Sequence, residues 1–384
     1  MKRVTLKLTT LVVLLGGSIS VSNAQSATNN INVVTSAVPF LRINQDTRTG
    51  AMGDAGIAIS PDANSSFSNI AKTPFNTSKY GLSLNYAPWL RDLAVNDVYV
   101  ASLAGFYKID DESAISASLR YFSLGSIQYT DNNGNDLTTG RPREFAFDAG
   151  YSRKLSAKNS IGIALRYINS NLASGTFNGV SYKAGNSVAG DIHFFHNGAK
   201  ENGEGFNWGA TLSNLGSKIS YTSDATQKDF IPADLGIGGA YTKVFDEDNK
   251  ITFALDLHKL LVPTPPAVGD SAGIASYRNK GVVSSWFSSF GDAPDKISEE
   301  IQEVNVSAGL EYWYNNQFAF RAGYFYENPN KGNRKFFSVG AGLKYNVFGL
   351  NFAYLFPSGS GISRNPLSNT YRFGLVFDFD AATK

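Results

Sequence analysis

The stretch I-G-I-A-L-R-Y, residues 161–167, decides the fold. Isoleucine, leucine and tyrosine occupy every second position, and Gly162, Ala164 and Arg166 lie between them. Strict alternation of this kind indicates a strand with one apolar and one polar face. The same period recurs along most of the chain, for example over residues 115–121, 206–213, 251–258, 318–324, 337–345 and 371–379. The sequence therefore predicts an all-β protein.

About fourteen segments share this pattern, and each is near the roughly 9–11 residues that a tilted membrane strand requires. We place them at 79–87, 96–107, 113–124, 144–153, 160–170, 186–196, 205–213, 233–243, 249–259, 303–313, 317–326, 335–345, 348–356 and 370–379.

The connections between these segments are sorted by length. Those after odd-numbered strands are mostly long, whereas those after even-numbered strands are mostly short. Short turns at one end and long loops at the other are typical of an outer-membrane barrel. A soluble sandwich has no reason to sort its loops in this way. We therefore predict a transmembrane antiparallel β-barrel of about 14 strands, with its turns in the periplasm and its loops outside.

The two faces of the predicted strands differ in charge. The face that we assign to lipid holds almost no charge, as expected when Arg or Lys at the bilayer midplane costs roughly 2–4 kcal/mol. The opposite face mixes charges of both signs with small residues, and its charged members are Arg120, Asp148, Arg166, Asp191, Asp256, Glu311, Arg321, Lys344, Arg372 and Asp378. Such a face predicts a crowded, paired lumen, with an open pore as the alternative.

The first two dozen residues resemble a targeting segment. Basic residues precede an apolar run at 8–19, and S-N-A at 22–24 fits a small-x-small cleavage site. We expect 1–24 to be a signal peptide; a transmembrane anchor is the alternative, but the run is shorter than the roughly 20 residues that a spanning helix needs. The 384 residues contain no cysteine, so a disulfide framework is excluded.

The chain before the first strand does not alternate. Residues 25–46 look like a poorly ordered lead-in, and residues 47–78 are rich in small residues. We expect 47–78 to be a hatch or plug inside the lumen of the barrel at 79–384, because irregular backbone at membrane depth must be enclosed by protein. Arg48, Asp54 and Asn69, together with Asp62, would pair with lumen groups. A periplasmic loop outside the barrel is the alternative.

Motifs for catalysis or metal binding are weak in this sequence. His193, His196 and His258 lack the spacing of a metal site, and residues 131–136 only faintly echo a calcium loop. We find no catalytic serine arrangement. The net charge of +2 gives no reason to expect nucleic acid. The sequence predicts neither an enzyme nor a cofactor.

The connection at 260–302 is far longer than ordinary loops, and such loops are commonly functional or disordered. Its V-V-S-S-W-F-S-S-F stretch, residues 282–290, contains Trp286, Phe287 and Phe290. Exposed aromatic side chains often mark binding surfaces. We therefore predict that these three residues contact cargo or a translocon, with Trp89 in the first outer loop as a second candidate. A short amphipathic helix folded over the barrel mouth is the alternative.

Several motifs resemble known families. R-T-G-A-M-G-D-A-G-I-A (48–58) and S-N-I-A (68–71) are similar to the hatch of FadL-type barrels, although Ile70 replaces the proline of their usual Asn-Pro-Ala motif. Further along, other stretches resemble the PorV (LptO) family, whose members are FadL-like outer-membrane proteins of the type IX secretion system in Bacteroidota. These stretches are Y-A-P-W-L-R-D-L (86–93), L-A-G-F-Y-K-I-D (103–110), L-R-Y-F-S-L-G (119–125) and Y-S-R-K-L-S (151–156).

The PorV resemblance implies a carrier role. Such a carrier binds the C-terminal signal domain of cargo that leaves the SprA (Sov) translocon. It then delivers the cargo to the sortase PorU, with PorQ and PorZ, for cleavage and anchoring to lipopolysaccharide. The wider FadL group implies an alternative, a transporter for long-chain fatty acids or other hydrophobic ligands. A lipopolysaccharide O-deacylase is a third reading, for which the sequence offers no nucleophile and base.

Overall fold

The structure is a computed structural model that describes residues 33–90, 97–131, 133–177, 179–223, 228–266, 270–357 and 369–379. The predicted signal peptide at 1–24 and the first part of the lead-in, 25–32, lie outside the described residues. Within the described part, no helix has both the length and the apolar character needed to cross a membrane.

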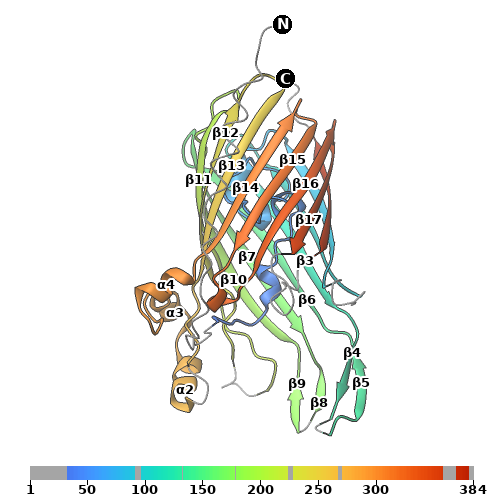
Figure 1. The fold of residues 1–384 in the computed structure, drawn as a ribbon, viewed down its shortest axis with the longest axis vertical. Coiled ribbons are helices and arrows are strands. Elements are labelled where there is room, and N and C mark those ends of the chain that lie inside the picture. Colours follow the sequence, from blue (N-terminus) through green and yellow to red (C-terminus); the bar gives the residue numbers. More distant parts are fainter. Residues whose placement is uncertain are drawn as a thin grey trace, which may run out of the picture. The chain divides into compact units, whose positions relative to one another are not determined.

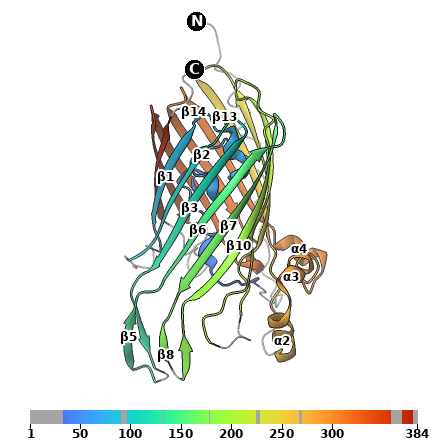
Figure 2. The ribbon, with the colours of Figure 1, turned by 180° about the vertical axis from the view of Figure 1, so that it is seen from behind.

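Fourteen strands of the described chain form a closed antiparallel barrel, as the sequence predicted (Figures 1 and 2). Closure is made by pairing of the first strand with the last, from Tyr80 opposite Phe379 to Tyr86 opposite Phe373. The strands are β1 (Tyr80–Pro88), β2 (Val98–Lys108), β3 (Ser113–Leu124), β6 (Arg143–Lys154), β7 (Asn159–Asn171), β10 (Gly185–His196), β11 (Gly205–Gly216), β12 (Asp234–Val244), β13 (Asn249–Leu260), β14 (Asn305–Tyr314), β15 (Phe318–Tyr326), β16 (Lys335–Tyr345), β17 (Phe348–Pro357) and β18 (Thr370–Phe379).

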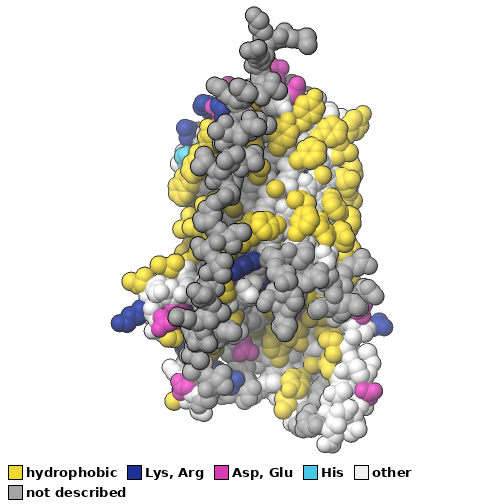
Figure 3. Space-filling model, viewed as in Figure 1, with side chains coloured by type: hydrophobic (Ala, Val, Ile, Leu, Met, Phe, Trp, Pro, Cys, Tyr) yellow, Lys and Arg dark blue, Asp and Glu magenta, His cyan; other side chains and the backbone are white. Residues whose placement is uncertain are grey.

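Side-chain exposure follows the predicted alternation. In β7 the side chain of Leu165 is 69% exposed, whereas its neighbours Ala164 and Arg166 are buried. The same holds in β13, where Phe253 is exposed and Asp256 is buried. Hydrophobic side chains accordingly spread over the outside of the wall (Figure 3). The barrel thus presents an apolar belt outward and its charges inward, which suits a bilayer.

The hairpins and helices of the described strand connections lie at one end of the barrel (Figure 1). Two short hairpins, which the sequence did not predict, extend the connections after β3 and β7; they are β4 (Ile127–Thr130) with β5 (Asp136–Gly140) and β8 (Gly175–Phe177) with β9 (Val180–Tyr182). The long connection at 260–302 contains α2 (Ser271–Asn279), α3 (Val282–Ser288) and α4 (Ile297–Gln302). The weak calcium-like motif is a turn of the first hairpin, in which the Asp131 carboxylate accepts from the backbone N–H of Asn133 and Asn135.

The chain before β1 is built of short helical turns. They are η2 (Pro39–Arg42), α1 (Thr47–Gly50), η3 (Ser65–Phe67) and η4 (Ile70–Phe75). Side chains cap the N-termini of two of them. The Asp46 carboxylate accepts hydrogen bonds from two backbone N–H groups of α1, and the side-chain carbonyl of Asn69 accepts one from the backbone N–H of Ala71. We call residues 33–79 the N-terminal segment.

The expectation of a poorly ordered lead-in was wrong for residues 33–46. Val38 and Phe40 are almost fully buried, and they pack with inward-facing side chains such as Val100, Phe122 and Ile168. These lead-in side chains lack a strand pattern, so their burial is not evident from the local sequence. It follows from the apolar patch that the inner wall offers them.

Candidate functional site

The N-terminal segment is bound to the inner face of the barrel wall by a buried ion network. The Arg48 guanidinium donates to both carboxylate oxygens of Glu311 on β14, from Nε at 2.8 Å and from Nη2 at 2.6 Å. Glu311 also accepts from Arg321 Nε on β15 at 2.7 Å. On its other side, Arg48 Nη1 lies 3.0 Å from Asp62 of the same segment. This bidentate geometry fixes both position and orientation of the segment.

Further bonds connect the segment to strands around the barrel. The backbone N–H groups of Gly56 and Ile57 donate to the Asp256 carboxylate on β13, at 2.6 and 2.8 Å. Asp54 lies 3.4 Å from Arg372 Nη1 on β18. The Asn69 amide donates to the Phe194 carbonyl of β10 at 3.0 Å. Each of the three residues that we assigned to the plug, Arg48, Asp54 and Asn69, therefore contacts the wall.

Ile70, which replaces the proline of the usual hatch motif, contacts three strands of the wall. Its backbone N–H donates to His193 Nδ1 on β10 at 3.0 Å. Its side chain lies against two glycines of the wall, where a Cβ at Gly150 would be 2.8 Å from Ile70 Cδ1 and a Cβ at Gly162 would be 2.5 Å from Ile70 Cγ1. Small residues on β6 and β7 thus make room for this isoleucine.

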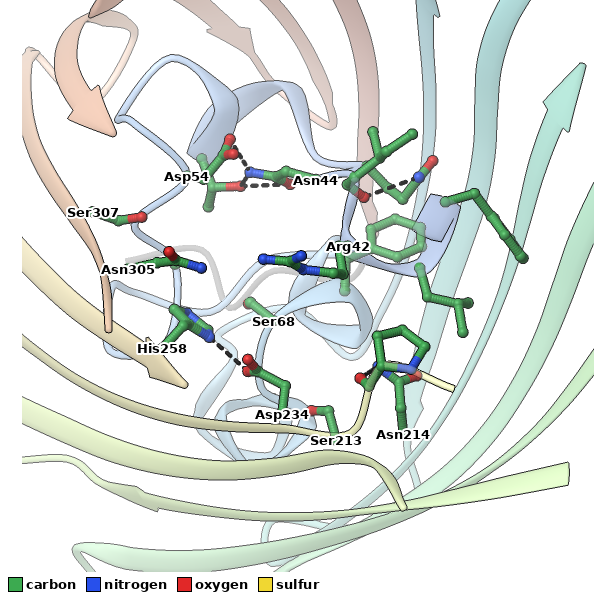
Figure 4. A pocket seen from close by; sticks show the side chains of 18 of the residues that line it. Arg42, Asn44, Asp54, Ser68, Ser213, Asn214, Asp234, His258, Asn305 and Ser307 are labelled. Atoms are coloured by element: carbon green, nitrogen blue, oxygen red, sulfur yellow. Dashed lines mark hydrogen bonds and ion pairs between the residues drawn. The ribbon is translucent and has the colours of Figure 1, made fainter. Parts of the chain in front are cut away.

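A cavity of about 570 Å³ lies between the segment and the wall. Arg42 points into it, between the Asn44–Asp54 pair on one side and the His258–Asp234 pair on the other (Figure 4). Phe40, Phe67 and Phe336 supply apolar lining. The cavity is therefore of mixed character, with aromatic rings and charges side by side.

Some buried polar atoms of the cavity lining have no hydrogen-bond partner among the described residues. They are Gln45 Oε1, Arg120 Nε, Asp256 Oδ1 and Arg372 Nε. Buried polar atoms are usually satisfied by protein, water or a ligand. The lining therefore suits water or a small molecule with polar groups.

Each of the three histidines has a different hydrogen-bond partner. His193 accepts from Ile70, His196 lies 2.7 Å from the Asn159 side chain, and His258 lies 2.7 Å from Asp234. Across the described residues, no group of three or more His, Asp or Glu side chains is arranged to hold a metal ion.

The long connection presents most of its predicted aromatic surface. Phe287 is 75% exposed and Phe290 is 51% exposed, whereas Trp286 is half-buried. Val283 is exposed as well, so α3 and its end present a stripe at positions i, i+4 and i+7. This stripe, Val283, Phe287 and Phe290, is called the α3 stripe below.

The structure differs from the expectation that Trp89 is exposed. Its side chain is only 5% exposed and packs with Phe40 and Leu41 of the N-terminal segment. The segment returns across the end of β1 and covers the indole. We therefore leave Trp89 out of any binding surface.

A family model described as "Type IX secretion system protein PorV" matches residues 25–267, which is more than half of the chain. The match ends before α2, α3 and α4, so the helical connection lies outside it. No curated protein matches the chain.

Solved structures share the fold at low identity. The TodX monoaromatic hydrocarbon channel, in a mutant form, has a TM-score of 0.53 at 13% identity, covering 87% of this chain and 97% of its own. The toluene transporter TbuX of Ralstonia pickettii has a TM-score of 0.52 at 10% identity, with 86% and 97% covered. A FadL homologue of Pseudomonas aeruginosa has a TM-score of 0.50 at 12% identity, with 88% and 99% covered. At such identities the likeness establishes a FadL-like barrel and nothing about ligands.

Proposed function

Because the chain belongs to the PorV family of type IX secretion system proteins, we propose that it is a cargo shuttle of that system. Membership makes it an outer-membrane component associated with the type IX secretion machinery. The proposed shuttle binds the C-terminal signal domain of cargo that leaves the SprA (Sov) translocon. It passes the cargo to the PorU attachment complex, with PorQ and PorZ, at the cell surface.

The α3 stripe is the observation that carries this proposal. Phe287 and Phe290 expose two phenyl rings at the end of the barrel with the long connections. Outer-membrane barrels present their long loops outside the cell, so we place this end at the surface. Aromatic anchors of this kind are frequent hot spots of protein interfaces. Val283 and the half-buried Trp286 extend the same surface.

The proposed role of the N-terminal segment is to close the lumen. Bonds from Arg48 to β14, from Gly56 to β13 and from Asn69 to β10 support a plug at 47–78 within the barrel at 79–384. Cargo would then move along the outside of a closed barrel and not through it. The first 24 residues would be removed on export.

The double substitution Phe287→Glu with Phe290→Glu tests the shuttle. We expect secretion of type IX cargo to fall strongly, because two anchors of the interface become charged, while the barrel still assembles. The matched control is Val180→Glu in β9, an exposed apolar side chain (41%) at the same end of the barrel. Cargo secretion that stays at the wild-type level in the double variant would refute the assignment of the α3 stripe.

A FadL-type transporter of hydrophobic ligands is the second candidate. The observation that favours it is the cavity of about 570 Å³ with phenyl rings in its lining. Deleting the gene distinguishes the two functions: the shuttle predicts loss of cargo secretion with unchanged fatty-acid uptake, whereas the transporter predicts the reverse.

A further inference from the structure

Helix α4 has its charged side turned toward the protein and its apolar side turned away. Glu299 and Glu300 are buried, as is Glu303 directly after the helix. Ile297 and Ile301, by contrast, are 76% and 66% exposed. This is the reverse of an amphipathic helix on a water-soluble protein, whose apolar side faces the core.

Lysines from two other elements neutralise the buried carboxylates. Lys259 Nζ lies 2.7 Å from Glu300 and 2.6 Å from Glu303, and Lys331 Nζ lies 2.5 Å from Glu299 and 3.0 Å from Glu303. Acidic residues are rarely buried unless they are paired in this way. The ion cluster of Lys259, Lys331 and the three glutamates therefore fixes the orientation of α4.

Lys259 also shows on which side of the wall α4 lies. In β13 the outward side chains are Phe253, Leu255 and Leu257, all exposed, while Asp256 between them is buried. Alternation places Lys259 on the same outward side, two residues beyond Leu257. Because Lys259 bonds to Glu300 and Glu303, α4 packs against the outside of the barrel at the end of β13.

The apolar side of this helical region adjoins the apolar belt of the barrel. Figure 1 places α3 and α4 beside the wall and not across the barrel mouth. In the same view, Figure 3 shows a row of hydrophobic side chains over α3 and α4 on their side nearest the belt, with charged side chains on the far side. An amphipathic helix with its apolar side on the membrane side lies in the bilayer interface.

We propose that α4 is a membrane foot: Ile297 and Ile301 insert into the outer boundary of the bilayer and extend the lipid-facing belt beyond β13. The ion cluster holds this foot against the wall. Lipid is the occupant, because the exposed isoleucines continue the apolar surface that Leu255 and Leu257 already present to the bilayer. The foot requires only the membrane and needs no bound cargo.

The absence of cysteine from the chain makes single-site labelling straightforward. Purified full-length Ile301→Cys, labelled with bimane, would be reconstituted in phosphatidylcholine vesicles. Quenching by brominated phosphatidylcholine reports lipid contact, and quenching by iodide reports water. Leu165→Cys on the belt is the lipid control, and Ser276→Cys, exposed on α2, is the water control. Heat-modifiable gel mobility confirms barrel assembly in each variant.

We expect the label at position 301 to lose fluorescence to brominated lipid to the same extent as that at 165, with little loss to iodide. Iodide quenching equal to that at 276, without lipid quenching, would overturn the proposal. Protection from both quenchers would overturn it as well, because a second copy of the protein would then cover the helix. No translocon or cargo is present, so the outcome does not depend on the proposed shuttle.

Discussion

The backbone N–H of Ile70 donates a hydrogen bond to Nδ1 of His193, 3.0 Å away across the lumen interface. A proline at position 70, as in the usual FadL-type hatch motif, has no N–H to donate. The two residues therefore form a pair that requires a residue other than proline at position 70.

We expect Ile70→Pro to destabilise the protein. It leaves the buried ring nitrogen of His193 unsatisfied, at a cost of about 1–3 kcal/mol. It also removes methyl and methylene groups that pack against Gly150 and Gly162. The denaturation midpoint in urea, followed by gel mobility of the folded barrel, measures this loss. Ile70→Val, which keeps the N–H, is the control and should lose only about 0.5–1.5 kcal/mol; a proline variant as stable as the wild type would contradict the pairing.

Loss of the Arg48–Glu311 pair should be costly. Arg48→Met leaves Glu311 with Arg321 alone, and breaking a buried pair typically costs about 3–5 kcal/mol. We also expect ion conductance in planar bilayers to rise, because the segment loses its bidentate bond to the wall. Lys243→Met breaks the exposed pair with Glu204 and serves as the control that should change neither quantity. Unchanged stability and conductance in Arg48→Met would exclude a closing role for this pair.

Gly323→Ala should prevent the N-terminal segment from docking. A Cβ at position 323 would lie 2.0 Å from the backbone of Met52 and Gly53, and Gly53 itself has a φ of +64°. Backbone on both sides cannot move as a flexible side chain would, so we expect a loss of at least about 1–3 kcal/mol or failed assembly. Gly349→Ala on β17 is the control, since its nearest atom would be 3.5 Å away. The yield of folded barrel compares the two; equal yields and midpoints would contradict the close approach.

The ion cluster that holds α4 should withstand mild acid. Burial raises the pKa of Glu299, but the hydrogen bonds from Lys331 and from the backbone N–H of Asp295, together with the positive charge of Lys331, outweigh it, and the pKa lies below its ordinary value. A carboxylate with a lowered pKa stabilises the fold fully above the ordinary value, about 4.3 for Glu, and loses this contribution only as the pH falls through the lower folded value. A label at Ile301→Cys can be followed by fluorescence while the protein in detergent is acidified from neutral pH. Its fluorescence should therefore change only below the ordinary pKa of a glutamate. In Glu299→Gln, which cannot ionise there, this acid step should weaken; release of the label near neutral pH would contradict the prediction.

The barrel wall was predictable from sequence because neighbouring residues of each strand alternate between the lipid side and the lumen side. In β7, Leu165 and Arg166 are adjacent in the chain and face opposite sides, so a register error of one residue would put every charge in lipid. Strands β3, β16 and β18 have the predicted bounds. The short hairpins β4–β5 and β8–β9 are too short and polar to carry such a pattern, and they were not predicted.

The ion-pair partners of the N-terminal segment could not be predicted from the local sequence. Arg48 was predicted to meet lumen charges, but its partner Glu311 lies 263 residues further along the chain. Exposure in the loops was similarly unpredictable: Trp89 and Phe287 are both aromatic residues in outer connections, yet one is covered by Phe40 and Leu41 and the other is open. The isoleucines of α4 gave no signal, because six residues are too few to show a helical period.

Alternation alone was thus sufficient to establish the wall, its inside and its outside, since a strand between lipid and lumen must change polarity at every residue. The tertiary structure decided how the N-terminal segment packs inside the wall and how the long connections pack beside it. The close approach of Gly53 to Gly323, the burial of Trp89 and the outward side of α4 each depend on a segment distant in the chain. Such contacts leave no local period, because only closure of the barrel brings their two halves together.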